Sequence, residues 1–128
     1  MLRYAFNVRE EISAKAYGRA LDISTKDSIE VCRAINGKSL KKAKTLLNDL
    51  LERKRSINGR YHDKTVKNVL AVLANAEKNA EFKGLNMDKL VVNASAHKGF
   101  VMLTPRRFKN RGERRARTHI QIVLVQKG

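Results

Sequence analysis

A strongly basic segment between two strand-like segments constrains this chain more than any other feature. Residues 105–117 read PRRFKNRGERRAR, in which seven of the thirteen residues are Lys or Arg and Glu113 is the single acid. The flanking segments alternate apolar and polar residues, a period typical of β-strands. Unpaired charges are costly to bury in a protein core. We therefore expect residues 105–117 to form the far end of a β-hairpin that lies outside the core and faces a polyanion.

The overall charge agrees with a nucleic-acid partner. The chain has 28 Lys and Arg against 12 Asp and Glu, a net charge of +16 over 128 residues. A cationic protein of the membrane surface would carry a basic amphipathic helix with Trp or Phe on its apolar face, and this sequence has no Trp and no helix of that type. The apolar fraction of 42% is ordinary for a folded protein, so we expect one domain over residues 1–128.

Signals for a membrane or a secreted location are missing from the sequence. It contains no run of about 18 apolar residues, so no membrane span is expected. Its first residues lack the apolar core of a secretory signal. The single cysteine, Cys32, excludes an internal disulfide framework and fits a reducing cytosol. These observations predict a cytoplasmic protein.

Helical patterns occupy the middle of the chain. Ser24 is a candidate N-cap for a first helix, which the Asn36-Gly37 pair should end. A second helix should begin at Ser39, and Asp63 can cap a third helix over about 64–83. Apolar residues at three- and four-residue spacing mark the expected core faces. They are Leu40, Ala43, Leu46, Leu47, Leu50 and Leu51 in the second helix, and Val66, Val69, Leu70, Leu73, Ala76 and Ala80 in the third.

Strand patterns follow after Gly84, and a weaker one precedes the helices. One face of a strand should carry Leu90, Val92, Ala94 and Ala96, and one face of the last strand Thr118, Ile120, Ile122 and Leu124. His119 and Gln121 fall on the opposite face of that last strand. Near the N-terminus, residues 14–17 are expected to be extended and to lead into an edge strand. This order predicts an α+β fold with helices packed on one face of a small antiparallel sheet.

The hairpin between the last two strands forms an arm over about residues 98–117. If its strands continue outward for about ten residues each, at roughly 3.3 Å per residue, the arm projects about 30 Å. Arginine clusters suit paired contacts with phosphate, and Phe108 can stack on a base or pack across the arm. The face formed by Lys41, Lys42 and Lys44 fits a solvated surface equally well. The residues expected to contact RNA are Arg53, Lys54, Arg55, Arg60, Lys98, Arg106, Arg107, Phe108, Lys109, Arg111, Arg114, Arg115, Arg117 and His119.

The residues needed for catalysis are poorly represented. His62, His97 and His119 have no partner at the spacing of a metal site. Cys32 falls near the apolar side of the first helix, where a small core residue is expected. Gly-rich phosphate loops and paired carboxylates are also missing from the sequence. We therefore expect no enzymatic activity, no metal and no cofactor.

Several segments resemble a known family when they are taken in order. They are NVLAVLANAEKNA at residues 68–80, the Pro-Arg-led basic segment from residue 105, and THIQIVL at residues 118–124. Together they resemble the large-subunit ribosomal protein L twenty-two family, from about Ala14 to Val125. The GRY at residues 59–61 and the AHK at 96–98 look more like the archaeal and eukaryotic branch. The bulky tip with Glu113 and the short connection before the third helix depart from the family pattern.

The resemblance implies a fold and a function. The fold is three helices against a three-stranded antiparallel sheet with a long protruding β-hairpin. The implied partners are large-subunit rRNA, neighbouring ribosomal proteins, and the nascent polypeptide at the wall of the exit tunnel, which the hairpin tip would line. Two alternatives remain at this point. One is a free-standing basic RNA-binding or RNA-chaperone protein, and the other is an RNA-modifying enzyme, which the lack of a catalytic constellation disfavours.

Overall fold

The structure of the chain, a computed structural model, describes residues 10–57, 59–103 and 114–126. Its helices are α1 (Thr25–Ile35), α2 (Leu40–Leu51) and α3 (Asp63–Phe82), and its strands are β1 (Ser13–Leu21), β2 (Leu90–Leu103) and β3 (Arg114–Gln126). Single 3-10 turns, Glu10–Ile12 and Met87–Lys89, precede β1 and β2. Three helices with a three-stranded antiparallel sheet confirm the predicted α+β fold.

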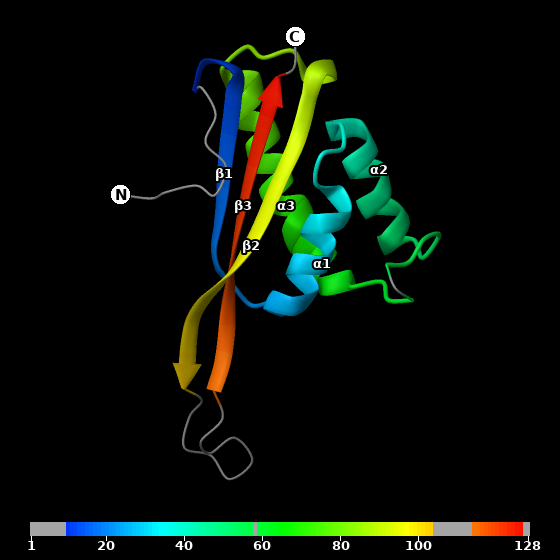
Figure 1. Ribbon diagram of the computed structural model, residues 1–128, viewed down its shortest axis with the longest axis vertical. Coiled ribbons are helices and arrows are strands. Elements are labelled where there is room, and N and C mark those ends of the chain that lie inside the picture. Colours follow the sequence, from blue (N-terminus) through cyan, green and yellow to red (C-terminus); the bar gives the residue numbers. More distant parts are fainter. Residues whose placement is uncertain (1–9, 58, 104–113, 127–128) are drawn as a thin grey trace.

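The sheet has the strand order β1-β3-β2, and both pairings are antiparallel. The predicted edge strand near the N-terminus is therefore confirmed as β1. Because β3 comes last in the sequence and lies between β1 and β2, neither β1 nor β2 has a strand to pair with until β3 is in place. Figure 1 shows the helices gathered on one side of this sheet, as predicted, with α3 running along it.

The core lies between the sheet and the helices. The predicted core faces of β2 and β3 meet: Val92 and Ala94 pair with Leu124 and Ile122, and all four side chains are buried. In α3, Val72 is buried in addition to the predicted face, whereas Leu70 is only partly buried. The fully buried side chains from the helices include Ile35, Leu47, Leu50, Val66, Val69 and Leu73. Burial on this scale supplies most of the free energy that holds the helices on the sheet.

Two of the predicted helix starts are confirmed and one is wrong. The hydroxyl oxygens of Ser24 and Ser39 accept hydrogen bonds from the first turns of α1 and α2. Gly37, after α1, has φ +81°, a left-handed conformation that glycine adopts without strain. Asp63, in contrast, is the first residue of α3 and not its cap. The cap position belongs to His62, which is itself left-handed and makes no capping hydrogen bond with its side chain.

The second face of β3 is more buried than simple alternation predicts. Gln121, Val123 and Val125 are buried although they point away from the helices. Val123 pairs with Lys15 on one side and with Asn93 on the other. In a central strand, side chains of both neighbouring strands cover its side chains. The hydrophobic pattern of a single strand does not predict this extra burial. Within the described ranges, no helix is both long and apolar enough to cross a membrane.

Candidate nucleic-acid interface

The inner part of the predicted arm is a two-stranded extension of the sheet. The β1 pairing with β3 ends at Leu21 and Thr118, whereas β2 and β3 remain paired from Val101–Ala116 to Leu103–Arg114. Figure 1 shows both strands running past the helices at this end of the molecule. The backbones of Arg114 and Arg115 belong to this paired region. The predicted site residues Arg106, Arg107, Phe108, Lys109 and Arg111 lie outside the described residues.

Three predicted site residues, Lys98, Arg117 and His119, lie at the point where the two-stranded extension leaves the sheet. Lys98 is exposed on β2 and pairs in register with Thr118, between Arg117 and His119. The Arg117 guanidinium lies 3.5 Å from the Asp22 carboxylate, and its side chain remains 30% exposed. The His119 ring lies 5.5 Å from the ring of Tyr17 on β1. The arm therefore leaves the body through a basic junction that is tied to the β1–α1 connection.

A close backbone approach shapes this junction. The register between β2 and β3 shifts between Lys98 and Val101, which marks an irregularity of the ladder at Gly99. A Cβ atom built on Gly99 would lie 2.8 Å from the carbonyl oxygen of Arg117. That distance is shorter than a van der Waals contact, so the two strands can approach this closely only because residue 99 has no side chain.

The loop between α2 and α3 carries the second predicted basic cluster, here called the basic loop (residues 53–60). Its cations are partly neutralised by acids of the same chain: Arg53 lies 3.1 Å from Asp63, Lys54 2.9 Å from Glu52, and Arg55 3.3 Å from Asp49. The Glu52 carboxylate raises the pKa of Lys54 through a hydrogen bond. These three basic side chains remain 59–68% exposed. Such surface pairs contribute little to stability, so an incoming phosphate can replace the acid.

Arg53 is held in place from two sides. Its guanidinium carbon lies 4.7 Å from the centre of the Tyr61 ring, a cation–π distance, while the same group reaches Asp63. Its backbone is left-handed, with φ 61°. Arg60 is exposed, and its backbone pairs with Ile57 to close the turn of the loop. The loop thus presents these cations beside a backbone pair of Ile57 and Arg60 and beside the Tyr61 ring.

The lysines of α2 differ in their surroundings. From the sequence, their face fitted a solvated surface and a contact surface equally well. Lys44 forms an ion pair with Glu77 of α3 and so faces the neighbouring helix. Lys41 and Lys42 instead border a groove of about 640 Å³, here called the α2 groove, which is lined by Gly37, Lys38, Ser39, Lys41, Lys42, Thr45 and Arg55. Lys41 also lies 2.9 Å from Asp88 and lowers the pKa of that carboxyl. Lys38 and Lys42 are therefore candidate site residues; the sequence left Lys42 undecided and did not single out Lys38.

The two predicted basic clusters are not brought together. Figure 1 places the connection between α2 and α3 at one flank of the body, apart from the β2–β3 extension. Arg55 does join the basic loop to the α2 groove, because it lines that groove. The described residues thus form two separate cationic surfaces. One lies at the arm junction, and the other consists of the α2 groove and the basic loop.

Cys32, which carries the single thiol of the chain, is a core residue. It is buried in α1, and burial raises the pKa of its thiol to about 12. A thiol in that state is neutral near pH 7 and is not a nucleophile. His97, another candidate from the sequence, is exposed and lies within hydrogen-bond distance of Ser95. Neither residue belongs to a catalytic constellation among the described residues.

The chain is thus a small, strongly basic α+β protein with an extended two-stranded ribbon, and comparison with known proteins places it more closely. The family described as Ribosomal protein L22p/L17e matches residues 16–125. The chain is 41% identical to the large ribosomal subunit protein uL22 of Archaeoglobus fulgidus over 122 aligned positions, which cover 79% of each chain. It is 38% identical to the uL22 of Methanococcus vannielii over 148 positions, which cover 98% of this chain and 97% of the relative.

The chain therefore belongs to the L22p/L17e family of ribosomal proteins, a family of structural and not enzymatic proteins. The alignment with the Methanococcus vannielii protein has 148 positions, more than the 128 residues of this chain, so that relative carries insertions. The uL22 of Sulfolobus acidocaldarius is 34% identical over 147 positions, which cover 92% of each chain. The predicted likeness to an archaeal-type ribosomal protein is confirmed by these matches.

Proposed function

We propose that this protein is built into the large ribosomal subunit in the cytoplasm, where its body and its basic arm bind rRNA and the arm tip lines the polypeptide exit tunnel. The observation that carries the proposal is the pairing of β2 with β3 beyond the end of β1, out to Leu103 and Arg114, which flank the basic sequence at residues 105–117. A ribbon of that length buries little apolar surface by itself. It needs a partner along its length, and its charge suits a polyanion.

The arm would act mainly through phosphate contacts. Lysine and arginine side chains that neutralise phosphates release condensed counterions, and this release drives non-specific binding. Arg114, Arg115 and Arg117 follow one another closely at the start of β3, next to the tip. Arginine adds planar, paired hydrogen bonds to phosphate, which fix the direction of the strand on the RNA. Contacts with folded RNA would then hold the two strands of the arm in one conformation.

The body would supply a second contact through the α2 groove and the basic loop. Lys38, Lys42 and Arg55 line this groove. In the ion pairs of Arg53, Lys54 and Arg55, each cation is more exposed than the acid it contacts. Exchange of a carboxylate for a phosphate keeps the charge interaction and adds counterion release. Contacts at both surfaces would fix the orientation of the protein, because they are well separated.

The tip would reach the tunnel and the nascent polypeptide. This part of the proposal is supported by family membership and by the length and charge of residues 104–117. Neighbouring ribosomal proteins are expected partners for the same reason. The bulky Arg107-Phe108-Lys109 stretch would narrow the tunnel more than small residues would.

Sedimentation of large subunits tests the first part of the proposal. A tagged full chain should remain in large subunits after a high-salt wash, and release by the wash would instead favour a free-standing RNA-binding protein. Photo-cross-linking from a stalled nascent chain tests the second part. Cross-links to residues 107–112 are expected, and their absence from subunits that retain the protein would refute the tunnel role alone.

A further inference from the structure

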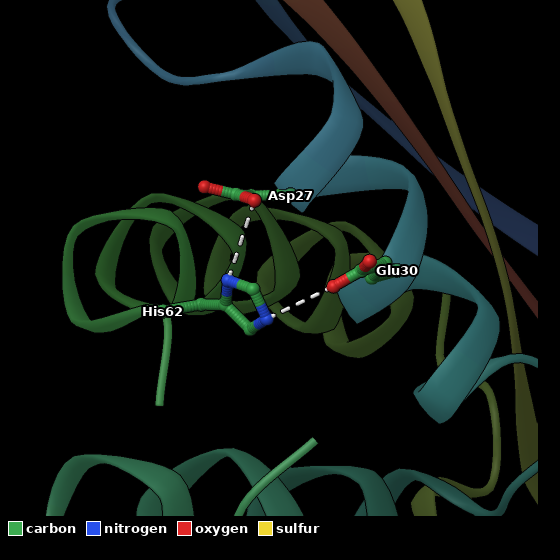
Figure 2. A group of neighbouring side chains, drawn as sticks. All are labelled: Asp27, Glu30 and His62. Atoms are coloured by element: carbon green, nitrogen blue, oxygen red, sulfur yellow. Dashed lines mark ion pairs between the residues drawn. The ribbon is translucent and has the colours of Figure 1, made fainter. Parts of the chain in front are cut away.

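The side chain of His62 is buried and faces two carboxylates of another helix. It precedes the first residue of α3, and its side chain is 2% exposed. Its backbone is left-handed, with φ 50° and ψ 44°, a conformation that residues with a Cβ atom adopt rarely. Figure 2 shows its ring between Asp27 and Glu30, which come from successive turns of α1. These acids are more than thirty residues away in the sequence, so spacing did not reveal the cluster.

The contacts within this cluster are incomplete as hydrogen bonds. His62 Nε2 lies 3.1 Å from Glu30 Oε2, and His62 Nδ1 lies 3.6 Å from Asp27 Oδ1. Nevertheless, Nε2 and Glu30 Oε2 are buried and neither has a hydrogen-bond partner among the described residues. The distance between them is that of an ion pair, but the direction is not that of a hydrogen bond. Buried polar atoms left in this way cost free energy and call for an explanation.

We propose that Asp27, Glu30 and His62 form a site for one divalent transition metal ion of the Zn²⁺ class. One ligand atom from each of the three residues can be chosen so that all lie within 4.8 Å of one another. Ligand atoms around a tetrahedral zinc ion, with bonds of roughly 2.0–2.2 Å, lie about 3.4 Å apart. His62 Nε2 and Glu30 Oε2, 3.1 Å apart, already lie near that spacing, so small side-chain rotations suffice for both to bind one ion. The imidazole nitrogen favours zinc-like ions over Mg²⁺ and Ca²⁺, which prefer oxygen ligands.

The two ring nitrogens suggest different roles for the two acids. Nε2 and the Glu30 carboxylate, which both lack hydrogen-bond partners, would bind the ion directly. The Asp27 carboxylate lies on the Nδ1 side and would accept a hydrogen bond from the Nδ1–H group, which fixes the tautomer and leaves the Nε2 lone pair for the metal. Asp27 is then a positioning residue, and water would complete the coordination.

Two basic side chains of the neighbouring segments are paired with acids outside the cluster. Arg53 is engaged with Asp63, the residue after His62, at 3.1 Å, and Lys64 lies 3.3 Å from Asp22. A bound ion would join α1 to the start of α3 and so hold the end of the basic loop. The site does not depend on RNA binding, so it stands or falls separately from the proposed function.

Cobalt titration of the metal-free full chain tests the proposal. Co²⁺ reports its ligands through visible absorption, and Zn²⁺ should displace it. We expect one Co²⁺ per chain, loss of the signal in H62Q, at least ten-fold weaker binding in E30Q, and ten- to hundred-fold weaker binding in D27N, the range typical of changes to a residue that orients a ligand. H97Q is the matched control, because His97 is an exposed histidine outside the cluster, and it should bind like the unchanged chain.

Two outcomes would overturn the proposal. Equal binding by H62Q and the unchanged chain would assign the ion to other residues. Failure to bind Co²⁺ or Zn²⁺ would leave a structural contact between the imidazole and two carboxylates as the explanation of the cluster. If H62Q does not fold, the test is the change in the thermal unfolding midpoint of the unchanged chain when Zn²⁺ is added. An ion that binds only the folded state must raise that midpoint. Zn²⁺ should raise the midpoint of the unchanged chain and H97Q more than that of E30Q, and no rise in the unchanged chain refutes the site.

Discussion

Gly99 and the carbonyl of Arg117 face each other so closely that a Cβ atom on residue 99 would lie 2.8 Å from the Arg117 oxygen. This approach occurs where the β2–β3 register shifts, at the junction between the body and the arm. The direction in which the arm leaves the sheet therefore depends on a residue without a side chain. Gly99 is part of the arm in the sequence, but its role becomes visible only when the opposite strand is in register.

Replacement of Gly99 by alanine should disturb this junction. The added methyl group must push the two backbones apart, and overpacking of this kind typically costs about 1–3 kcal/mol. Chemical denaturation of the isolated protein should show a loss of that size. Lys98→Ala is the control, because Lys98 is exposed beside the same irregularity, and it should change stability by less than about 0.5 kcal/mol. Equal effects of the two changes would show that the close approach is not maintained.

The arginines at the start of β3 should determine the salt dependence of RNA binding. If Arg114, Arg115 and Arg117 each contact a phosphate, their replacement by Gln should make the log–log salt slope shallower by about 2 to 3. A matched triple change of exposed lysines outside the proposed site controls for the lost charge, at Lys26, Lys67 and Lys78. A slope that responds equally to both triple variants would argue against specific phosphate contacts by β3.

Shortening of the arm should separate folding from function. Deletion of residues 104–114 with a short turn in their place removes none of the described core side chains. The free energy of unfolding should therefore change by less than about 1 kcal/mol. Cross-links from nascent chains should be lost while the shortened protein still enters large subunits. A large loss of stability would show that the arm packs on the body.

Truncation in the core should have the opposite effect. Leu73 is fully buried in α3, whereas Leu70, one turn away, is only partly buried. Leu73→Ala should destabilise the protein by about 2–5 kcal/mol, because a cavity adds to the lost transfer free energy. Leu70→Ala should cost clearly less. Denaturant titration of both variants measures the difference, and a reversed order would contradict the packing of α3.

Alkaline pH should reveal the burial of Cys32. Its pKa is raised from 9.0 to about 12 in the folded protein, so above pH 9 the unfolded chain loses a proton that the folded chain retains. The stability that the neutral thiol contributes should thus fall as pH rises from about 9 to 12. Cys32→Val removes this titration, and its stability should fall less steeply over the same range. Parallel pH profiles of the two proteins would mean that the thiol is accessible to water when folded.

Local patterns in the sequence determined much of the fold. The caps at Ser24 and Ser39 and the apolar stripes of α2 and α3 rest on contacts within a few residues, which propensity and periodicity describe well. The same is true of the alternation in β2 and β3. The prediction failed at Asp63 because the start of α3 is set by distant partners: His62 turns toward α1, and Asp63 pairs with Arg53.

The sequence by itself also pointed to a polyanionic partner, since an excess of sixteen positive charges and the basic run at 105–117 need no tertiary structure to be recognised. Only the tertiary structure decided how individual charges are used. It pairs Lys44 with Glu77, places Lys42 in a groove, and brings His62 to Asp27 and Glu30. The physical reason is that ion pairs and buried polar clusters act over a few ångströms between residues that are distant along the chain. Their partners are chosen by how the helices pack, and no local spacing records that choice.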